Sequence, residues 1–166
     1  MIETPLGSME VEVDTVRAPA TGRNFLRYVD QGSYSGGRFH RTVRLDNQPE
    51  NAVMIEVIQG GLDSRRAKDF PPIRLERTAE TGLSHRDGTI SMARGGPDTA
   101  TSDFFICIGD QPELDFGGKR NPDRQGFAAF GKVVRGMEVV RQIQTARAQG
   151  QRLTPPIEIV DITRAR

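Results

Sequence analysis

The residues most able to do chemistry lie near the middle of the chain, on two segments with extended patterns. In residues 103–108 the period-two alternation places Phe105 beside the carboxylate of Asp103 and sends Phe104 to the opposite face. A large apolar ring on a polar face indicates a partly exposed aromatic platform; alternatively, both faces are covered and Phe105 is ordinary core. Gln59 ends another segment as a neutral amide, directly before two glycines that let a second backbone approach closely. Phe105 and Gln59 are therefore the first candidates for a functional surface, with an ordinary surface glutamine as the alternative for Gln59.

The sequence lacks the residues that several other chemistries require. Two histidines, His40 and His85, and one cysteine, Cys107, are too few for a zinc site of ordinary composition, so we expect no metal. No G-x-S-x-G or S-x-x-K motif is present. The Gly-Gly-Lys at residues 117–119 lacks both the first glycine and the hydroxyl residue of a phosphate-binding loop. Hydrolases and metalloenzymes are disfavoured, and Cys107 is predicted to be a small buried hydrophobe.

Length and charge are those of one ordinary folded domain, residues 1–166. The 23 basic and 22 acidic side chains leave a net charge of +1, which gives no general attraction to nucleic acid or membranes. Lys119, Arg120 and Arg124 are expected to form a solvated loop face. No apolar run approaches the roughly 18 residues of a membrane helix, and Met1 begins no signal peptide. We expect a soluble protein, cytoplasmic, or periplasmic if a signal peptide has been removed.

The elements that must position these residues are mostly strands. Eighteen glycines and ten prolines indicate many turns. Alternating or apolar patterns predict strands over residues 8–14, 38–44, 53–61, 89–93, 103–108, 127–134 and 157–163, the last beginning after Pro155-Pro156. One helix is predicted to begin at Pro19 and stop at Gly32, and another to cover residues 135–145. With so few helices the strands should be antiparallel, and a closed barrel capped by two helices is the economical arrangement.

Several motifs in order resemble the cyclophilin-type peptidyl-prolyl cis-trans isomerases. They are F-H-R at residues 39–41, V-I-Q-G-G at 57–61 and S-M-A-R…F-F-I at 91–106. The likeness spans nearly the whole chain and includes F-A-A-F-G-K-V at 127–133. It implies a mainly β fold, an eight-stranded closed antiparallel β-barrel capped by two α-helices, with a proline-binding groove on the outer surface. It also implies isomerisation of X-Pro bonds in folding proteins, without cofactor or covalent intermediate.

The resemblance assigns roles to particular residues. Arg41 matches the catalytic arginine of the family and Gln59 its supporting glutamine. Phe105 matches the aromatic floor of the proline pocket, with Val57 and Leu114 as neighbouring apolar walls.

Four further positions complete the implied substrate-binding set, the fourth being Asp103, which departs from the family pattern as described below. Ala93 and Arg94 match the segment whose backbone pairs with the substrate peptide, so the arginine side chain itself should matter little. Phe127 replaces a histidine of the family and keeps the pocket apolar.

Other positions depart from the family pattern. Glu56 stands where a phenylalanine is common, which predicts a weakened or displaced pocket wall. Glu113 replaces a tryptophan that the family's cyclic-peptide inhibitor contacts, and weak binding of that inhibitor is expected. Asp103 replaces a glutamine and either orients Arg41 or draws it away from the substrate. The segment at residues 42–52 is longer than usual and is expected to reshape one side of the groove.

Rotation about an X-Pro bond faces a barrier of about 18–20 kcal/mol from amide resonance. A dry pocket for the ring, together with a cation that donates to the prolyl nitrogen in the twisted state, would lower that barrier. Arg41 suits this role because a guanidinium stays charged. The expected partners are proline-containing polypeptides, bound by a monomer. The second hypothesis, motivated by Glu56 and Asp103, is a proline-peptide binding module of the same fold with weak or no catalysis.

Overall fold

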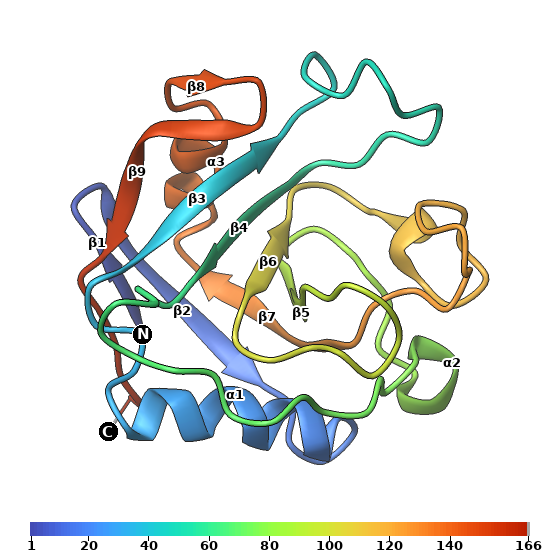
Figure 1. Ribbon diagram of the computed structural model, residues 1–166, viewed down its shortest axis with the longest axis horizontal. Coiled ribbons are helices and arrows are strands. Elements are labelled where there is room, and N and C mark those ends of the chain that lie inside the picture. Colours follow the sequence, from blue (N-terminus) through green and yellow to red (C-terminus); the bar gives the residue numbers. More distant parts are fainter. Residues whose placement is uncertain (166) are drawn as a thin grey trace.

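One antiparallel sheet makes up most of the structure, a computed structural model in which residues 1–165 are described (Figure 1). Its ten strands are β1 (Ile2–Thr4), β2 (Gly7–Val13), β3 (Gly37–Val43), β4 (Val57–Gly61), β5 (Thr89–Met92), β6 (Phe104–Cys107), β7 (Ala129–Arg135), β8 (Ala148–Gln149), β9 (Arg152–Ile159) and β10 (Asp161–Ile162). Their order across the sheet is β10-β1-β2-β7-β5-β6-β4-β3-β9-β8. The mainly β, antiparallel fold predicted from the sequence is confirmed.

The strand number and the ring closure predicted for the barrel are not confirmed. The strand order ends at β10 on one side and β8 on the other, and β1, β8 and β10 are only two or three residues long. Strands this short carry too little alternation to be recognised. The sheet nevertheless curls back on itself, because Val160 alone separates β9 from β10, which pairs with β1. Val160 N donates to Glu3 O at 2.8 Å. The chain just after β9 therefore contacts β1 through a single hydrogen bond in place of a continuous ladder.

Two helices lie where the patterns predicted them, and a third was not predicted. The α-helices are α1 (Pro19–Asp30), α2 (Thr78–Thr81) and α3 (Met137–Gln144), and a 3-10 helix, η1, covers Pro112–Leu114. Helix α1 begins at the proline and buries Phe25 against the sheet, while α3 buries Val140 and Ile143. Helix α2 is a single turn inside a segment expected to be irregular. None of the helices in residues 1–165 combines the length and apolar character needed to cross a membrane.

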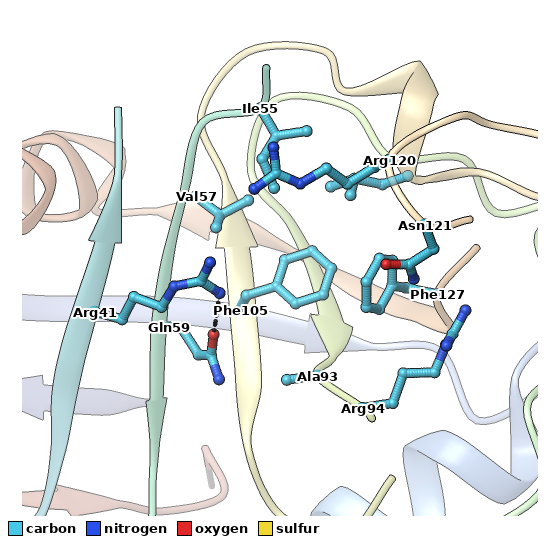
Figure 2. A pocket seen from close by; sticks show the side chains of 11 residues that line it. Arg41, Ile55, Val57, Gln59, Ala93, Arg94, Phe105, Arg120, Asn121 and Phe127 are labelled. Atoms are coloured by element: carbon cyan, nitrogen blue, oxygen red, sulfur yellow. Dashed lines mark hydrogen bonds between the residues drawn. The ribbon is translucent and has the colours of Figure 1, made fainter. Parts of the chain in front are cut away.

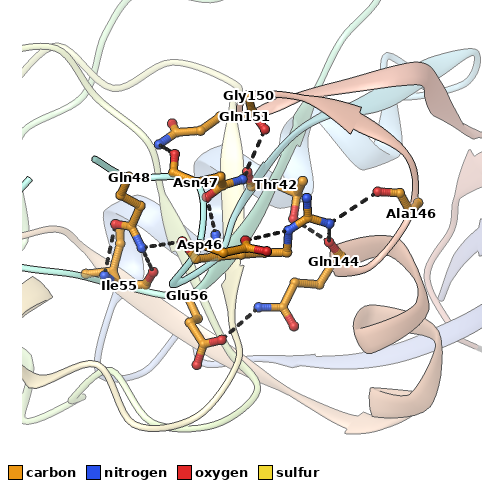
Figure 3. Close-up of polar contacts among 11 residues, drawn as sticks. Thr42, Asp46, Asn47, Gln48, Ile55, Glu56, Gln144, Ala146, Gly150 and Gln151 are labelled. Carbon is orange, nitrogen blue, oxygen red and sulfur yellow. Dashed lines mark hydrogen bonds and ion pairs between the residues drawn. The ribbon is translucent and has the colours of Figure 1, made fainter. Parts of the chain in front are cut away.

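Two predicted strand boundaries are wrong, both for local reasons. The strand predicted from residue 53 begins only at Val57, because the buried amide of Gln48 hydrogen-bonds both backbone groups of Ile55 and holds the preceding segment as a loop (Figure 3). The two prolines expected before the last strand lie inside β9. They fall where its ladder to β3 is interrupted, between the partners Arg152 and Ile157, so their missing N–H groups cost no ladder bond.

Strand β6 separates two hydrophobic clusters. Phe104 and Ile106 point into the main core between the sheet and α1, and Phe104 packs edge-on against Phe25 at 5.6 Å. Phe105 and Cys107 point the other way, into a smaller cluster on the outer face. The Phe105 side chain is only 4% exposed, so the partly exposed platform was wrong in degree and both faces of β6 are covered. Cys107 is the predicted buried hydrophobe, and burial raises the pKa of its thiol.

Candidate active site

A cavity of about 220 Å³ opens on the outer face of the sheet above strands β4 and β6 (Figure 2). It is lined by Arg41, Ile55, Val57, Gln59, Ala93, Arg94, Phe105, Leu114, Arg120, Asn121 and Phe127. Every site residue named from the sequence therefore lines this one cavity, except Asp103. An apolar floor with a few polar groups at its edge is the ordinary character of a ligand site.

Sheet register aligns three of these side chains in a row. Arg41 of β3 pairs with Gln59 of β4, and Gln59 pairs with Phe105 of β6. Directly opposed residues in an antiparallel sheet point to the same face. The row therefore sets a cation, an amide and an aromatic ring side by side along the cavity (Figure 2).

A β-bulge makes this row possible. Strict alternation would place Phe39 and Arg41 on the same face, yet Phe39 is fully buried in the main core and Arg41 lines the outer cavity. Phe39 pairs with Gly60 and Arg41 with Gln59, so the residue between them, His40, is the extra one. An extra residue turns the following side chains to the opposite face. The bulge thus brings the guanidinium out to the cavity.

Neutral amides hold the Arg41 guanidinium. Its Nη1 donates to Gln59 Oε1 at 3.0 Å and its Nε to Gln151 Oε1 at 2.9 Å. The guanidinium is partly removed from water, and this burial lowers the pKa of Arg41. No hydrogen bond engages its Nη2 among residues 1–165, so that donor is available to a ligand.

Asp103 does not contact Arg41, so neither predicted effect of its charge operates directly. Its Oδ2 instead accepts a hydrogen bond from Gln59 Nε2 at 3.1 Å and lies 3.0 Å from His40 Nε2. Because the amide nitrogen of Gln59 is committed to Asp103, its carbonyl oxygen faces Arg41. Asp103 acts on the cavity through Gln59.

The floor of the cavity is an aromatic pair backed by a buried imidazole. Phe105 packs edge-on against Phe127, with ring centroids 5.2 Å apart, and stacks on His85 at 5.9 Å. His85 is held from both sides, since its Nδ1 lies 2.7 Å from Asp115 Oδ1 and its Nε2 lies 2.9 Å from Ser91 Oγ. These contacts fix the plane on which the Phe105 ring rests.

The Arg94 side chain has a larger structural part than predicted. Both of its Nη atoms contact the Asp123 carboxylate at 3.0 Å, and Nε and Nη2 donate to the carbonyl of Gly126. Its guanidinium carbon also lies 4.9 Å from the Phe127 ring centroid. Arg94 therefore holds the loop that delivers Phe127 to the cavity wall.

Two further departures from the family pattern, Glu56 and Glu113, also lie outside the cavity lining. Glu56 accepts a hydrogen bond from Gln144 Nε2 at 3.2 Å, and its neighbour Ile55 lines the cavity (Figure 3). Glu113 Oε2 accepts from the backbone N of Lys119 at 2.7 Å. The wall expected to be weakened at Glu56 is thus formed by an isoleucine one residue earlier.

Three lining residues were missed. Ile55 shares the alternation of Val57 and Gln59, so period two alone could have assigned it to the site. Arg120 and Asn121 come from a long polar loop with no periodic pattern, and nothing in the sequence separates Arg120 from its exposed neighbour Lys119. The solvated loop face was therefore wrong for Arg120.

Comparisons with known proteins identify the family. Residues 1–164 match the family model described as cyclophilin type peptidyl-prolyl cis-trans isomerase/CLD. The chain is 37% identical over 167 residues to peptidyl-prolyl cis-trans isomerase A of Dickeya dadantii, covering 96% of this chain and 80% of that one. It is 34% identical over 141 residues to peptidyl-prolyl cis-trans isomerase B of Escherichia coli, covering 83% and 79%.

The fold is similar to that of a cyclophilin-type isomerase of Cryptosporidium parvum whose crystal structure was determined in the presence of the dipeptide Ala-Pro. The TM-score is 0.78 at 22% identity, over 99% of this chain and 98% of that one. Given the match over nearly its whole length, the chain belongs to the cyclophilin-type peptidyl-prolyl cis-trans isomerases and is an enzyme of that family.

Proposed function

We propose that the cavity above β4 and β6 is the catalytic site, where proline-containing polypeptides bind and their X-Pro bonds rotate. In this proposal the prolyl ring rests on Phe105, with Val57, Leu114 and Phe127 as walls. The observation that carries it is the row of Arg41, Gln59 and Phe105 on one face of three neighbouring strands. That row offers an apolar seat and a charged donor within a single cavity, as this reaction requires.

Arg41 supplies the rate enhancement in this mechanism. In the planar amide the prolyl nitrogen shares its lone pair with the carbonyl and accepts hydrogen bonds poorly. At the twisted transition state the nitrogen becomes pyramidal and its lone pair can accept from a guanidinium. A contact made mainly in that state lowers the barrier instead of tightening substrate binding. The partial burial of Arg41 strengthens the contact, because fewer water molecules compete for the charge.

The proposed mechanism needs no covalent step, because the neighbours of Arg41 only hold its guanidinium in place. Gln59 and Gln151 hold the guanidinium by hydrogen bonds that need no proton transfer. Ala93 and Arg94 contribute the edge along which the substrate backbone lies.

The Cryptosporidium parvum enzyme studied with Ala-Pro supports a proline peptide as the ligand. The hypothesis of a non-catalytic binding module rested on Glu56 and Asp103, and neither lines the cavity.

The test is a protease-coupled or exchange-NMR assay on an X-Pro peptide. Arg41→Ala is expected to lower kcat/KM by about 10²–10³-fold, the usual loss for a preorganised charged donor. Arg38→Ala is the matched control. It removes a guanidinium from the same strand, but Arg38 lies 3.4 Å from Asp63 and outside the cavity lining, so its activity should stay within about twofold of wild type. Wild-type rates no higher than those of Arg41→Ala would refute the proposal.

A further inference from the structure

A second guanidinium extends over the cavity. The Arg120 side chain crosses from the loop between η1 and β7 toward Ile55 and Val57, on the side of Phe105 away from Ala93 (Figure 2). All three charged residues that line the cavity are arginines, Arg41, Arg94 and Arg120. The cavity therefore has cations on several sides, and none of residues 1–165 places a carboxylate in its wall.

These three arginines differ in how their charge is compensated. Arg94 faces Asp123 through two hydrogen bonds of 3.0 Å, so its charge is neutralised within the protein. Arg120 contacts only neutral acceptors, and Nη1 alone makes both bonds: to Gln48 Oε1 at 2.9 Å and to Val53 O at 2.7 Å. Among residues 1–165 no hydrogen bond engages its Nε or Nη2.

The charge of Arg41 also acts on Arg120. Burial lowers the pKa of Arg120, and the positive charge of Arg41 lowers it further. Two uncompensated guanidinium groups in a partly desolvated cavity repel each other, and an anion placed between them would relieve that repulsion. A carboxylate is the matching group, because it accepts the remaining fork donors of an arginine in charge-assisted hydrogen bonds.

Resting on the proposed isomerase function, we propose that Arg120 is a specificity-determining residue that selects X-Pro segments with an acidic side chain adjacent to the proline. The prolyl ring occupies the seat at Phe105, and the neighbouring Asp or Glu carboxylate meets Nε and Nη2 of Arg120. The preference is for substrate charge, so it is separate from the donation by Arg41 that lowers the barrier.

The experiment compares matched peptides in which glutamine or glutamate stands directly before or directly after the proline. For wild type at low ionic strength, the kcat/KM ratio of Glu to Gln peptide should be about three to ten in one of the two series, as expected for a partly desolvated ion pair. The ratio should fall toward one as salt screens the charges. Arg120→Gln should bring it to about one at every salt concentration.

Two variants separate charge from loop structure. Arg120→Lys keeps the charge but loses the fork, and should retain most of the preference. Lys119→Gln removes the same charge from the exposed neighbouring residue and should leave the ratio at the wild-type value. A ratio near one in wild type for both series, or an unchanged ratio in Arg120→Gln, would overturn the inference. Turnover of the glutamine peptides would still uphold the isomerase itself, whereas failure on every peptide would count against the proposed function.

Discussion

Individual side chains in the cavity depend on partners behind them. Gln59 lies between a cation and an anion, accepting from Arg41 and donating to Asp103. An amide can rotate by half a turn and exchange its oxygen for its nitrogen, so Asp103 determines which end meets Arg41. Gly61 makes room for this carboxylate, since a Cβ there would collide with Asp103 Oδ1. The arrangement predicts that Asp103 supports turnover.

Replacing Asp103 tests this dependence. Asp103→Ala frees the Gln59 amide and is expected to lower kcat about tenfold, or ~1.4 kcal/mol in the barrier, with a smaller change in KM. Asp103→Asn keeps an acceptor oxygen and should recover part of the loss. His40→Ala removes the other partner of Asp103 and should cost less than Asp103→Ala. Faster turnover in Asp103→Ala than in wild type would mean that the carboxylate restrains Arg41.

At the scale of elements, the cavity depends on features that interrupt regular structure. The bulge at His40 turns Arg41 outward, and the Arg94–Asp123 pair fastens the loop that ends at Phe127. The Arg94–Asp123 pair is the easier of the two features to test by mutation, because the Arg94 side chain is only 1% exposed and its loss should have a measurable effect. Loss of the pair should loosen the loop before it affects the sheet.

Arg94→Ala is expected to destabilise the protein by about 1–3 kcal/mol, because it removes charge-assisted hydrogen bonds and leaves the Gly126 carbonyl without its partner. Hydrogen exchange should rise in residues 116–127 more than in β6. The measurements are amide exchange and urea unfolding of the two proteins. Unchanged exchange in that loop would contradict the fastening role.

The Arg94–Asp123 pair makes the destabilisation caused by Arg94→Ala depend on pH. The Arg94 guanidinium holds the pKa of Asp123 below its ordinary value of 3.8. A carboxylate with a lowered pKa in the folded state stabilises the protein above the ordinary value, and its contribution disappears as the pH falls through the lowered pKa. The difference in unfolding free energy between wild type and Arg94→Ala should therefore be constant from pH 7 to about pH 5 and shrink below pH 4.

Much of this architecture could be predicted because it is periodic. Alternation along β6 and β4 grouped Phe105 apart from Phe104 and aligned Val57 with Gln59, and helical spacing located α1 and α3. The bulge at His40 could not be predicted from alternation, since the pattern of residues 38–44 reads equally well as an unbroken strand. The position of Arg120 was also out of reach, because its partners Gln48 and Val53 lie about 70 residues away in another loop.

For the whole molecule, the curled sheet depends on the last strand. Ile162 of β10 pairs with Ile2 of β1, and both side chains are buried in the main core. This pairing brings the end of the described chain onto its beginning, on the side of the sheet that ends with β10. The stability of the fold should be sensitive to it although it is far from the cavity.

Ile162→Ala is expected to lower the free energy of unfolding by about 2–4 kcal/mol, the usual cost of removing a buried isoleucine. Val160→Ala is the matched control; Val160 is 44% exposed, and its loss should cost at most about 0.5 kcal/mol. Urea unfolding measures both. Equal effects of the two changes would show that β10 adds little to the core. Residual kcat/KM of the folded fraction should match wild type.

The alternation of β6 also bears on how such an enzyme can diversify. Phe104 belongs to the main core and its neighbour Phe105 to the outer cluster. Two consecutive residues are therefore constrained differently, one by core packing and the other by the cavity. Substitutions in the outer cluster can therefore alter which substrates bind, while the residues of the main core stay the same. The alternation of a single four-residue strand thus allows substrate preference to change without a change of fold.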